Sequence, residues 1–149
     1  MSSNGATGLM SGKRGLIMGV ANERSIAWGI AQALAEQGAE MAFSYLGEAL
    51  QRRVEPLASG IGVDLVLPCD VGDDASMDAL FDRLRQEWGT LDFLVHAIGF
   101  SDKEQLRGRY ADTTRDNFAM TMDISVYSFT AVAQRAAALM PDGGSMLTL

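Results

Sequence analysis

A glycine and a serine stand where an apolar run meets a helical segment, a spacing that could bind a phosphate. The run ends at Met18, Gly19 follows it, and Ser25 precedes residues with a helical pattern. Gly19 would let the backbone turn sharply and approach a ligand without a Cβ in the way. Ser25 is the predicted N-cap, and the positive helix terminus would attract a pyrophosphate. A tight strand-to-helix connection without a ligand is the alternative.

This turn departs from the common nucleotide-binding signatures. It matches neither G-x-G-x-x-G nor G-x-x-x-x-G-K-[ST], and instead reads Gly19, five residues, Ser25, then Ala27 and Gly29. Glycine inside a helix costs about 1 kcal/mol relative to alanine. We therefore expect Ala27 and Gly29 to mark a close approach between the helix and a sheet.

Residues after two later apolar runs could meet the same ligand. Asp70 follows one run, where its carboxylate could accept a hydrogen bond from an adenine amino group or cap a turn. Gly99 follows another and would let the chain pass a ribose and a nicotinamide, with Ile98 covering them. Cys69 is predicted to be a buried, unreactive residue rather than a nucleophile.

Histidine and cysteine are scarce, which limits the catalytic bases, metal ligands and disulfides that the chain can offer. His96 is the only histidine and lies inside an apolar run, which favours a hydrogen-bonded core residue over a base. Without clustered His and Cys ligands, no metal site is expected. A single cysteine leaves no internal disulfide and is typical of a reducing, cytoplasmic compartment.

Length and charge bound the class of protein. The 149 residues fit one domain, and a hydrophobic fraction of 48% can form a core. A net charge of −7 without a Lys/Arg stripe argues against nucleic-acid binding. The apolar runs are too short for a membrane span, and the first residues lack the apolar region of a secretory signal.

The hydrophobic pattern predicts strands that alternate with helices. The predicted strands are residues 14–18, 40–45, 64–68, 93–98 and 145–149, and the predicted helices are residues 25–37, 48–59, 75–88 and 114–140. The run 64–68 is apolar throughout, which predicts burial on both faces. We expect a flexible leader at 1–12 and, at 13–149, an α/β, Rossmann-like doubly wound parallel sheet, incomplete in this chain. Ligands should bind at the carboxyl ends of its strands.

Four segments keep a characteristic order and spacing: GVANERSIAWGIA, Cys69-Asp70-Val71, HAIGFSD and DISVYSF. Together they resemble the NADH-dependent bacterial enoyl-[acyl-carrier-protein] reductases, a branch of the short-chain dehydrogenase/reductase superfamily. The resemblance covers residues 9–149. HAIGF is close to the SIGF form of this branch, where ordinary short-chain dehydrogenases usually carry Asn-Ala-Gly.

The resemblance implies a reductase of bacterial fatty-acid elongation that uses NADH. Hydride would pass from the nicotinamide to the β-carbon of a trans-2-enoyl thioester on acyl carrier protein, and the enolate would then be protonated. Matched positions imply a pyrophosphate and nicotinamide side at Gly19, Ser25 and Ile26, and an adenine side at Asp70 and Val71. They imply a nicotinamide-ribose contact at Ile98 and a backbone contact with the acyl substrate at Ser101.

The sequence departs from the family pattern in two places. The adenosine contact after the second strand is commonly Gln, and Leu46 stands there. No acid or base occupies that strand tip, and we favour NADH over NADPH. The family's catalytic Tyr and Lys follow the fifth strand, whereas this sequence ends at Leu149. We therefore expect a truncated sequence of an active enzyme, and the catalytic residues stay unknown.

Two other functions stay open. One is a short-chain alcohol/ketone dehydrogenase, for which a Tyr-x-x-x-Lys spacing beyond Leu149 would be typical; the other is a non-catalytic nucleotide-binding fragment. The resemblance also implies a homotetramer. The apolar stretch 124–139 contains small residues that suit a subunit interface, although core packing within one subunit explains it too.

Overall fold

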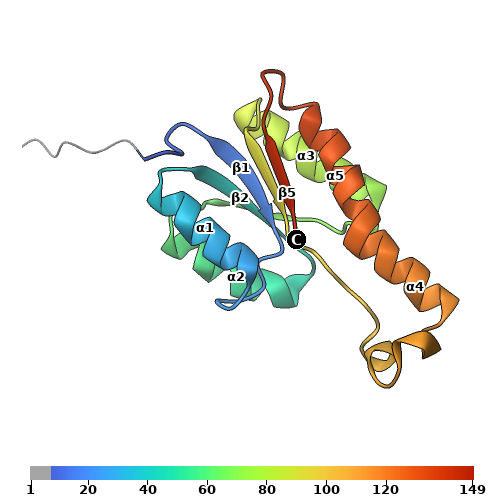
Figure 1. Ribbon diagram of the computed structural model, residues 1–149. Coiled ribbons are helices and arrows are strands. Elements are labelled where there is room, and N and C mark those ends of the chain that lie inside the picture. The colour runs from blue at the N-terminus through green and yellow to red at the C-terminus, as the bar shows by residue number, and fades with distance from the viewer. Residues whose placement is uncertain (1–7) are drawn as a thin grey trace, which may run out of the picture.

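The computed structural model describes residues 8–149 and contains one parallel sheet with helices on both faces (Figure 1). Its strands are β1 (Arg14–Met18), β2 (Glu40–Tyr45), β3 (Leu65–Pro68), β4 (Phe93–His96) and β5 (Ser145–Thr148). They lie in the order β3-β2-β1-β4-β5. The chain starts in the middle, moves outward to β3, and crosses back to β4. The fold is therefore the predicted α/β, Rossmann-like class, with its strand order reversing between β1 and β4.

The helices divide between the two faces of this sheet. Helices α1 (Ile26–Glu36) and α2 (Glu48–Gly60) cover one face, and α3 (Asp74–Trp88), α4 (Arg115–Met122) and α5 (Ser128–Ala137) lie on the other side (Figure 1). Two short 3-10 helices, η1 (Lys103–Leu106) and η2 (Tyr110–Asp112), follow β4. A π-helical turn, η3 (Asp123–Tyr127), joins α4 to α5.

Strand β1 supplies both hydrophobic cores because successive side chains of a strand point to opposite faces. Leu16 and Met18 pack in the cluster that includes α3 and α5, and Ile17 packs with α1 and α2. Ile17 lies in register with Phe43 of β2 and Val95 of β4. All three β1 side chains are fully buried, so the central strand is fixed from both sides.

Local capping sets several predicted boundaries. Gly38 has a φ of +88°, and its N–H bonds to the carbonyl of Ala35 while Ala39 bonds to Leu34. This pair of bonds is the Schellman ending that glycine favours. At the start of α3, the Asp73 carboxylate accepts from the Ala75 N–H at 3.2 Å. Both ends lie within one residue of the bounds predicted for these helices.

Four sequence expectations about the elements were wrong. Strand β3 is not buried on both faces, because it is an edge strand and its residues Leu65, Val66 and Leu67 are half-buried. Strand β4 ends at His96, two residues earlier than predicted. Gly29 makes no close approach to the sheet: it is exposed, and a Cβ there would meet open space. The helical tract after residue 114 contains the π-helical turn η3, which its sequence did not predict.

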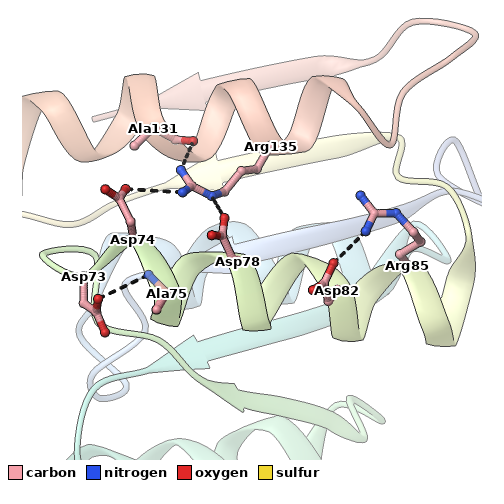
Figure 2. Close-up of polar contacts among 8 residues, drawn as sticks. All are labelled: Asp73, Asp74, Ala75, Asp78, Asp82, Arg85, Ala131 and Arg135. Carbon is pink, nitrogen blue, oxygen red and sulfur yellow. Dashed lines mark hydrogen bonds and ion pairs between the residues drawn. The ribbon is translucent and has the colours of Figure 1, made fainter.

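Helix α5 is fastened to α3 by one arginine (Figure 2). The Arg135 guanidinium donates to Asp78 at 2.7 Å and to Asp74 at 3.3 Å, and it also bonds the Ala131 carbonyl at 3.0 Å. Its side chain is 18% exposed, and these bonds raise its pKa. By contrast, the nearby pair Arg85–Asp82 lies within α3 alone. Arg135 therefore links two helices on the same face of the sheet.

Of the predicted leader, residues 1–7 lie outside the described residues. Residues 8–12 form a turn in which the Met10 N–H bonds the Gln37 carbonyl at 2.9 Å. Across residues 8–149, no helix is long and apolar enough to cross a membrane. The same residues contain no group of three or more acidic, His or Cys side chains that could hold a metal ion.

Candidate functional site

Two adjoining cavities lie at the carboxyl end of the sheet, where the strand order reverses. The smaller, of about 300 Å³, lies against the start of α1, and the larger, of about 420 Å³, extends toward the ends of β2 and β3. Both are lined by Gly19, Ala97, Ile98 and Gly99. Together they form one crevice across the ends of β1 and β4, at the edge where open α/β sheets bind ligands.

Position 19 has no room for a side chain, because the ends of β1 and β4 approach closely there. Its φ is +109°, and a Cβ there would overlap the carbonyl oxygen of Ala97. The Ala97 N–H also bonds the Met18 carbonyl at 2.9 Å. The described contacts therefore require glycine for the packing of the two strand ends, before any ligand is considered.

Ser25 is the N-cap residue of α1, but its hydroxyl does not cap the helix as predicted. Its Oγ accepts instead from the N–H groups of Ala21 at 3.0 Å and Asn22 at 3.1 Å. The serine thus closes the turn before the helix. The first-turn N–H groups of Ile26 and Ala27 have no intrahelical carbonyl to bond, and both residues line the smaller cavity.

The far end of the larger cavity is lined by residues that follow β2 and β3. Leu46 and Val71 line it together with Asp70. Leu46 is 57% exposed, whereas Val71 is buried. One Asp70 carboxylate oxygen accepts from the Gly72 N–H at 2.8 Å, so Asp70 does cap a turn. Its contact with an adenine stays a prediction.

Cys69 lines the same cavity but is poorly suited to chemistry. Its side chain is buried, and burial together with the Asp70 charge raises its pKa to about 11. The thiol is therefore protonated at neutral pH, and only the thiolate is a good nucleophile. The structure agrees with the predicted unreactive core residue.

His96 is also a core residue, as predicted. It is fully buried, and burial lowers its pKa. Its ring bonds Ser128 Oγ at 2.8 Å and Thr148 Oγ1 at 3.0 Å. The Ser128 hydroxyl donates to the Ile124 carbonyl at 2.6 Å, so its oxygen accepts from the histidine. This network assigns the ring proton to Nε2, and Thr148 then donates to Nδ1.

The segment after β4 is held by side chains to which the sequence analysis gave no role. Ser125 Oγ bonds both the N–H and the carbonyl of Phe100, and Asn117 Oδ1 accepts from the Asp102 N–H at 3.0 Å. The predicted substrate contact Ser101 bonds Thr121 and Asn117, and it lines neither cavity. The DISVYSF segment carried a signal, because Ser125 stands between the apolar residues Ile124 and Val126.

The structure brings most of the predicted site residues together. Those that line the crevice are Gly19, Ser25, Ile26, Leu46, Asp70, Val71 and Ile98. The tyrosines are dispersed: Tyr45 lines the larger cavity, while Tyr110 and Tyr127 are exposed on η2 and η3. None of the described residues is assigned as a catalytic acid.

These features define a Rossmann-like α/β protein with a crevice at its strand-order reversal, the edge where open α/β sheets bind ligands. Comparison with known proteins narrows the class. Residues 19–149 match the family described as enoyl-(acyl carrier protein) reductase. The chain belongs to this family.

Relatives from several bacteria agree with that assignment. The chain is 66% identical over 142 residues to enoyl-[acyl-carrier-protein] reductase [NADH] 2 of Rhizobium meliloti, a match that covers 95% of this chain and 53% of the relative. A crystal structure of FabI from Candidatus Liberibacter asiaticus superposes with a TM-score of 0.93 at 56% identity, covering 95% of this chain and 55% of that one.

A second solved structure was determined with a ligand. The reductase of Anaplasma phagocytophilum in complex with NAD superposes with a TM-score of 0.92 at 56% identity, covering 95% of this chain and 54% of that chain. The chain spans about half the length of the curated relatives it matches.

Proposed function

We propose that the protein is an NADH-dependent enoyl-[acyl-carrier-protein] reductase of bacterial fatty-acid elongation. The observation that carries the proposal is the crevice between the ends of β1 and β4. It is lined by the residues that the family resemblance matches to dinucleotide contacts, from Gly19 and Ile26 on one side to Leu46 and Asp70 on the other.

The start of α1 suits the pyrophosphate of a dinucleotide. Because the Ser25 hydroxyl bonds the preceding turn, the N–H groups of Ile26 and Ala27 are available to an anion, and the helix dipole favours negative charge there. Asp70, Val71 and Leu46 would contact the adenosine, and Ile98 would contact the nicotinamide ribose. When bound, NADH supplies the hydride.

Hydride transfer to the substrate would take place beside an apolar surface on the β4 side. Ile98 and Phe100 line the larger cavity and would exclude water from the transferred hydride. As the β-carbon of the enoyl thioester gains hydride, the electron pair of the C=C bond moves toward the thioester to give an enolate. A proton then adds to the α-carbon. We assign Ser101 a backbone contact with the acyl substrate and assign no proton donor among the described residues.

The tip of β2 supports NADH rather than NADPH. A 2′-phosphate on the adenosine ribose is usually bound by a cation near this strand. Leu46 and Gly47 stand there, and the neighbouring Glu48 pairs with Arg52 at 3.6 Å. A protein that oxidises NADPH as efficiently as NADH would contradict this part of the proposal.

We also propose that the protein is a cytoplasmic homo-oligomer, a tetramer, that acts on a substrate carried by acyl carrier protein. Within the suggested interface stretch, Ala131, Val132 and Ala136 are buried in the core of the subunit. An exposed apolar row lies before and at the start of this stretch, where Phe118, Met122 and Val126 repeat every four positions along α4 and η3. That exposed row supports contact with a second copy, which sedimentation would test.

The test is reduction of a trans-2-enoyl thioester of acyl carrier protein by the full-length protein, followed as loss of NADH absorbance. We expect NADH loss that depends on the double bond, with the saturated thioester as the control. A flat trace from folded protein would overturn the proposal. Reduction of a ketone in place of the enoyl thioester would assign the protein to the short-chain alcohol/ketone dehydrogenases.

A further inference from the structure

The π-helical turn η3 lies beside the crevice and brings two serines to the segment that follows β4. A π turn contains an extra residue within a helix, and such turns are often found at functional sites. Here it lies between α4 and α5, with Ser125 inside the turn and Ser128 directly after it. Both hydroxyls bond groups of the β4 segment.

Ser125 makes two bonds to the backbone of a single residue. Its Oγ accepts from the Phe100 N–H at 3.0 Å and donates to the Phe100 carbonyl at 3.2 Å. One hydroxyl thus satisfies both backbone groups of Phe100, as a neighbouring strand would. The loop is therefore fixed to the helix at this residue.

Ser128 fixes the other end of the segment through a side chain. Its Oγ bonds the ring of His96 at 2.8 Å and donates to the Ile124 carbonyl at 2.6 Å. His96 is the last residue of β4. The two serines therefore hold the chain at His96 and at Phe100.

Residues 97–99 lie between these two attachments and line both cavities of the crevice. Gly99 lies close enough that a Cβ there would be 3.8 Å from Ser125 Oγ. The turns at Leu46 and Asp70, by contrast, have no hydrogen bond to Ser125 or Ser128 within the described residues. Displacement of Phe100 would therefore change one side of the crevice and leave the other in place.

We propose that Ser125 is a positioning residue for the nicotinamide side of the crevice. Its hydroxyl holds Phe100, and thereby Ile98 and Gly99, in the place where the nicotinamide ribose binds. This inference rests on the proposed function, since it takes the ligand to be NADH. Ser125 itself is half-buried, so its loss exposes the freed backbone groups to water and leaves the core intact.

The experiment compares two ligands in the full-length protein. ADP occupies the adenosine and pyrophosphate side alone, whereas NADH occupies both sides. For Ser125→Ala we expect NADH to bind about fivefold more weakly, the size of one net hydrogen bond, with ADP affinity unchanged. The amide hydrogen of Phe100 should also exchange faster with solvent. Ser125→Thr should restore NADH affinity, and Ser59→Ala, an exposed serine on α2, is the matched control.

The other outcomes separate failure of the inference from failure of the proposed function. Equal NADH affinity in folded Ser125→Ala and wild type overturns it, and an equal loss of ADP and NADH affinity shows a general structural role. If Ser125→Ala does not fold, Ser125→Thr and Ser125→Val, which have the same shape and differ in the hydroxyl, give the same comparison. A wild-type protein that binds NADH but reduces no enoyl thioester contradicts the proposed function and leaves the comparison valid. A wild type that does not bind NADH overturns both.

Discussion

The two sides of the crevice are held by different kinds of contact. On the β1–β2–β3 side, the side-chain hydrogen bonds are local: Asp70 bonds Gly72 and Ser76, and Ser25 bonds Ala21 and Asn22. On the β4 side they span the chain, because His96 bonds Ser128 and Phe100 bonds Ser125. The side-chain bonds span 2 to 6 residues on the first side and 32 and 25 residues on the second.

This difference has a physical consequence. A turn closed by its own residues keeps its shape when distant elements move. The β4 side, in contrast, keeps its shape only while α5 and η3 stay in place against the sheet. We therefore expect mutations in distant helices to alter the β4 side more than the β1–β2–β3 side.

The largest expected effect is at the contact where the two sides meet. Gly19→Ala places a Cβ against the Ala97 carbonyl at a φ of +109°, and backbone strain and overpacking together should cost roughly 3–5 kcal/mol of unfolding free energy. Gly12 has a φ of +77° but open space around its Cβ position, so Gly12→Ala should cost only about 1–2 kcal/mol. Urea unfolding measures both; equal costs would show that the Ala97 contact is unimportant.

The next effect concerns the link between α3 and α5, the helix that contacts the end of β4. Arg135→Met removes the link from α5 to Asp74 and Asp78 of α3 (Figure 2) and should cost about 1–2 kcal/mol, since the arginine is largely shielded from water. Arg85→Met removes an exposed pair within α3 and should cost about 0.5 kcal/mol or less. Thermal unfolding of the two variants gives the comparison. A smaller loss for Arg135→Met than for Arg85→Met would argue against the link.

A smaller effect is expected on the β1–β2–β3 side, at Asp70. Asp70→Ala removes the bond to the Gly72 N–H and any contact with the adenine, and should weaken NADH binding by about 1 kcal/mol. Asp70→Asn keeps an oxygen for the turn and should lose less. Calorimetric titration with NADH measures both variants. Unchanged affinity in Asp70→Ala would leave Asp70 as a turn cap alone.

The smallest expected effect is the pH dependence of stability that His96 gives to the β4 side. Burial lowers the pKa of His96 below its ordinary value of 6.5, so the unfolded chain binds a proton at a higher pH than the folded one. Stability from this group is present above pH 6.5 and decreases as pH falls from there toward the folded pKa. An NMR titration of the His96 ring should give a midpoint below 6.5, with the signal identified by its loss in His96→Gln. A midpoint above that value would contradict the buried network.

The features that could be predicted from the sequence are those determined by residues close together in the chain. The strands, the glycine that ends α1 and the aspartate cap of α3 depend on residues within a few positions of one another. Ser25 was harder, because its hydroxyl can bond either the helix or the preceding turn, and the two options compete. The sequence pattern alone does not decide between them.

The remaining differences come from packing between distant elements. Gly29 lies off the buried face of α1, which is formed by Ala27, Trp28 and Ala31, so its small size serves no contact with the sheet. The π turn has no local signature; it coincides with the bonds from Ser125 and Ser128 to the β4 segment. Gly19, Asp70 and Ile98 could be predicted to lie together because strand ends meet at one edge of a parallel sheet. The roles of Ile26, Leu46 and Val71 were implied by the family resemblance.

We propose that NADH binds across the ends of β1 and β4. Hydrogen exchange of the full-length protein with and without NADH is the test. We expect slower exchange at Ile26 and Ala27, at the start of α1, and at Gly99 and Phe100 after β4. Protection confined to another surface, or no protection at a concentration that saturates binding, would contradict the assignment of this crevice.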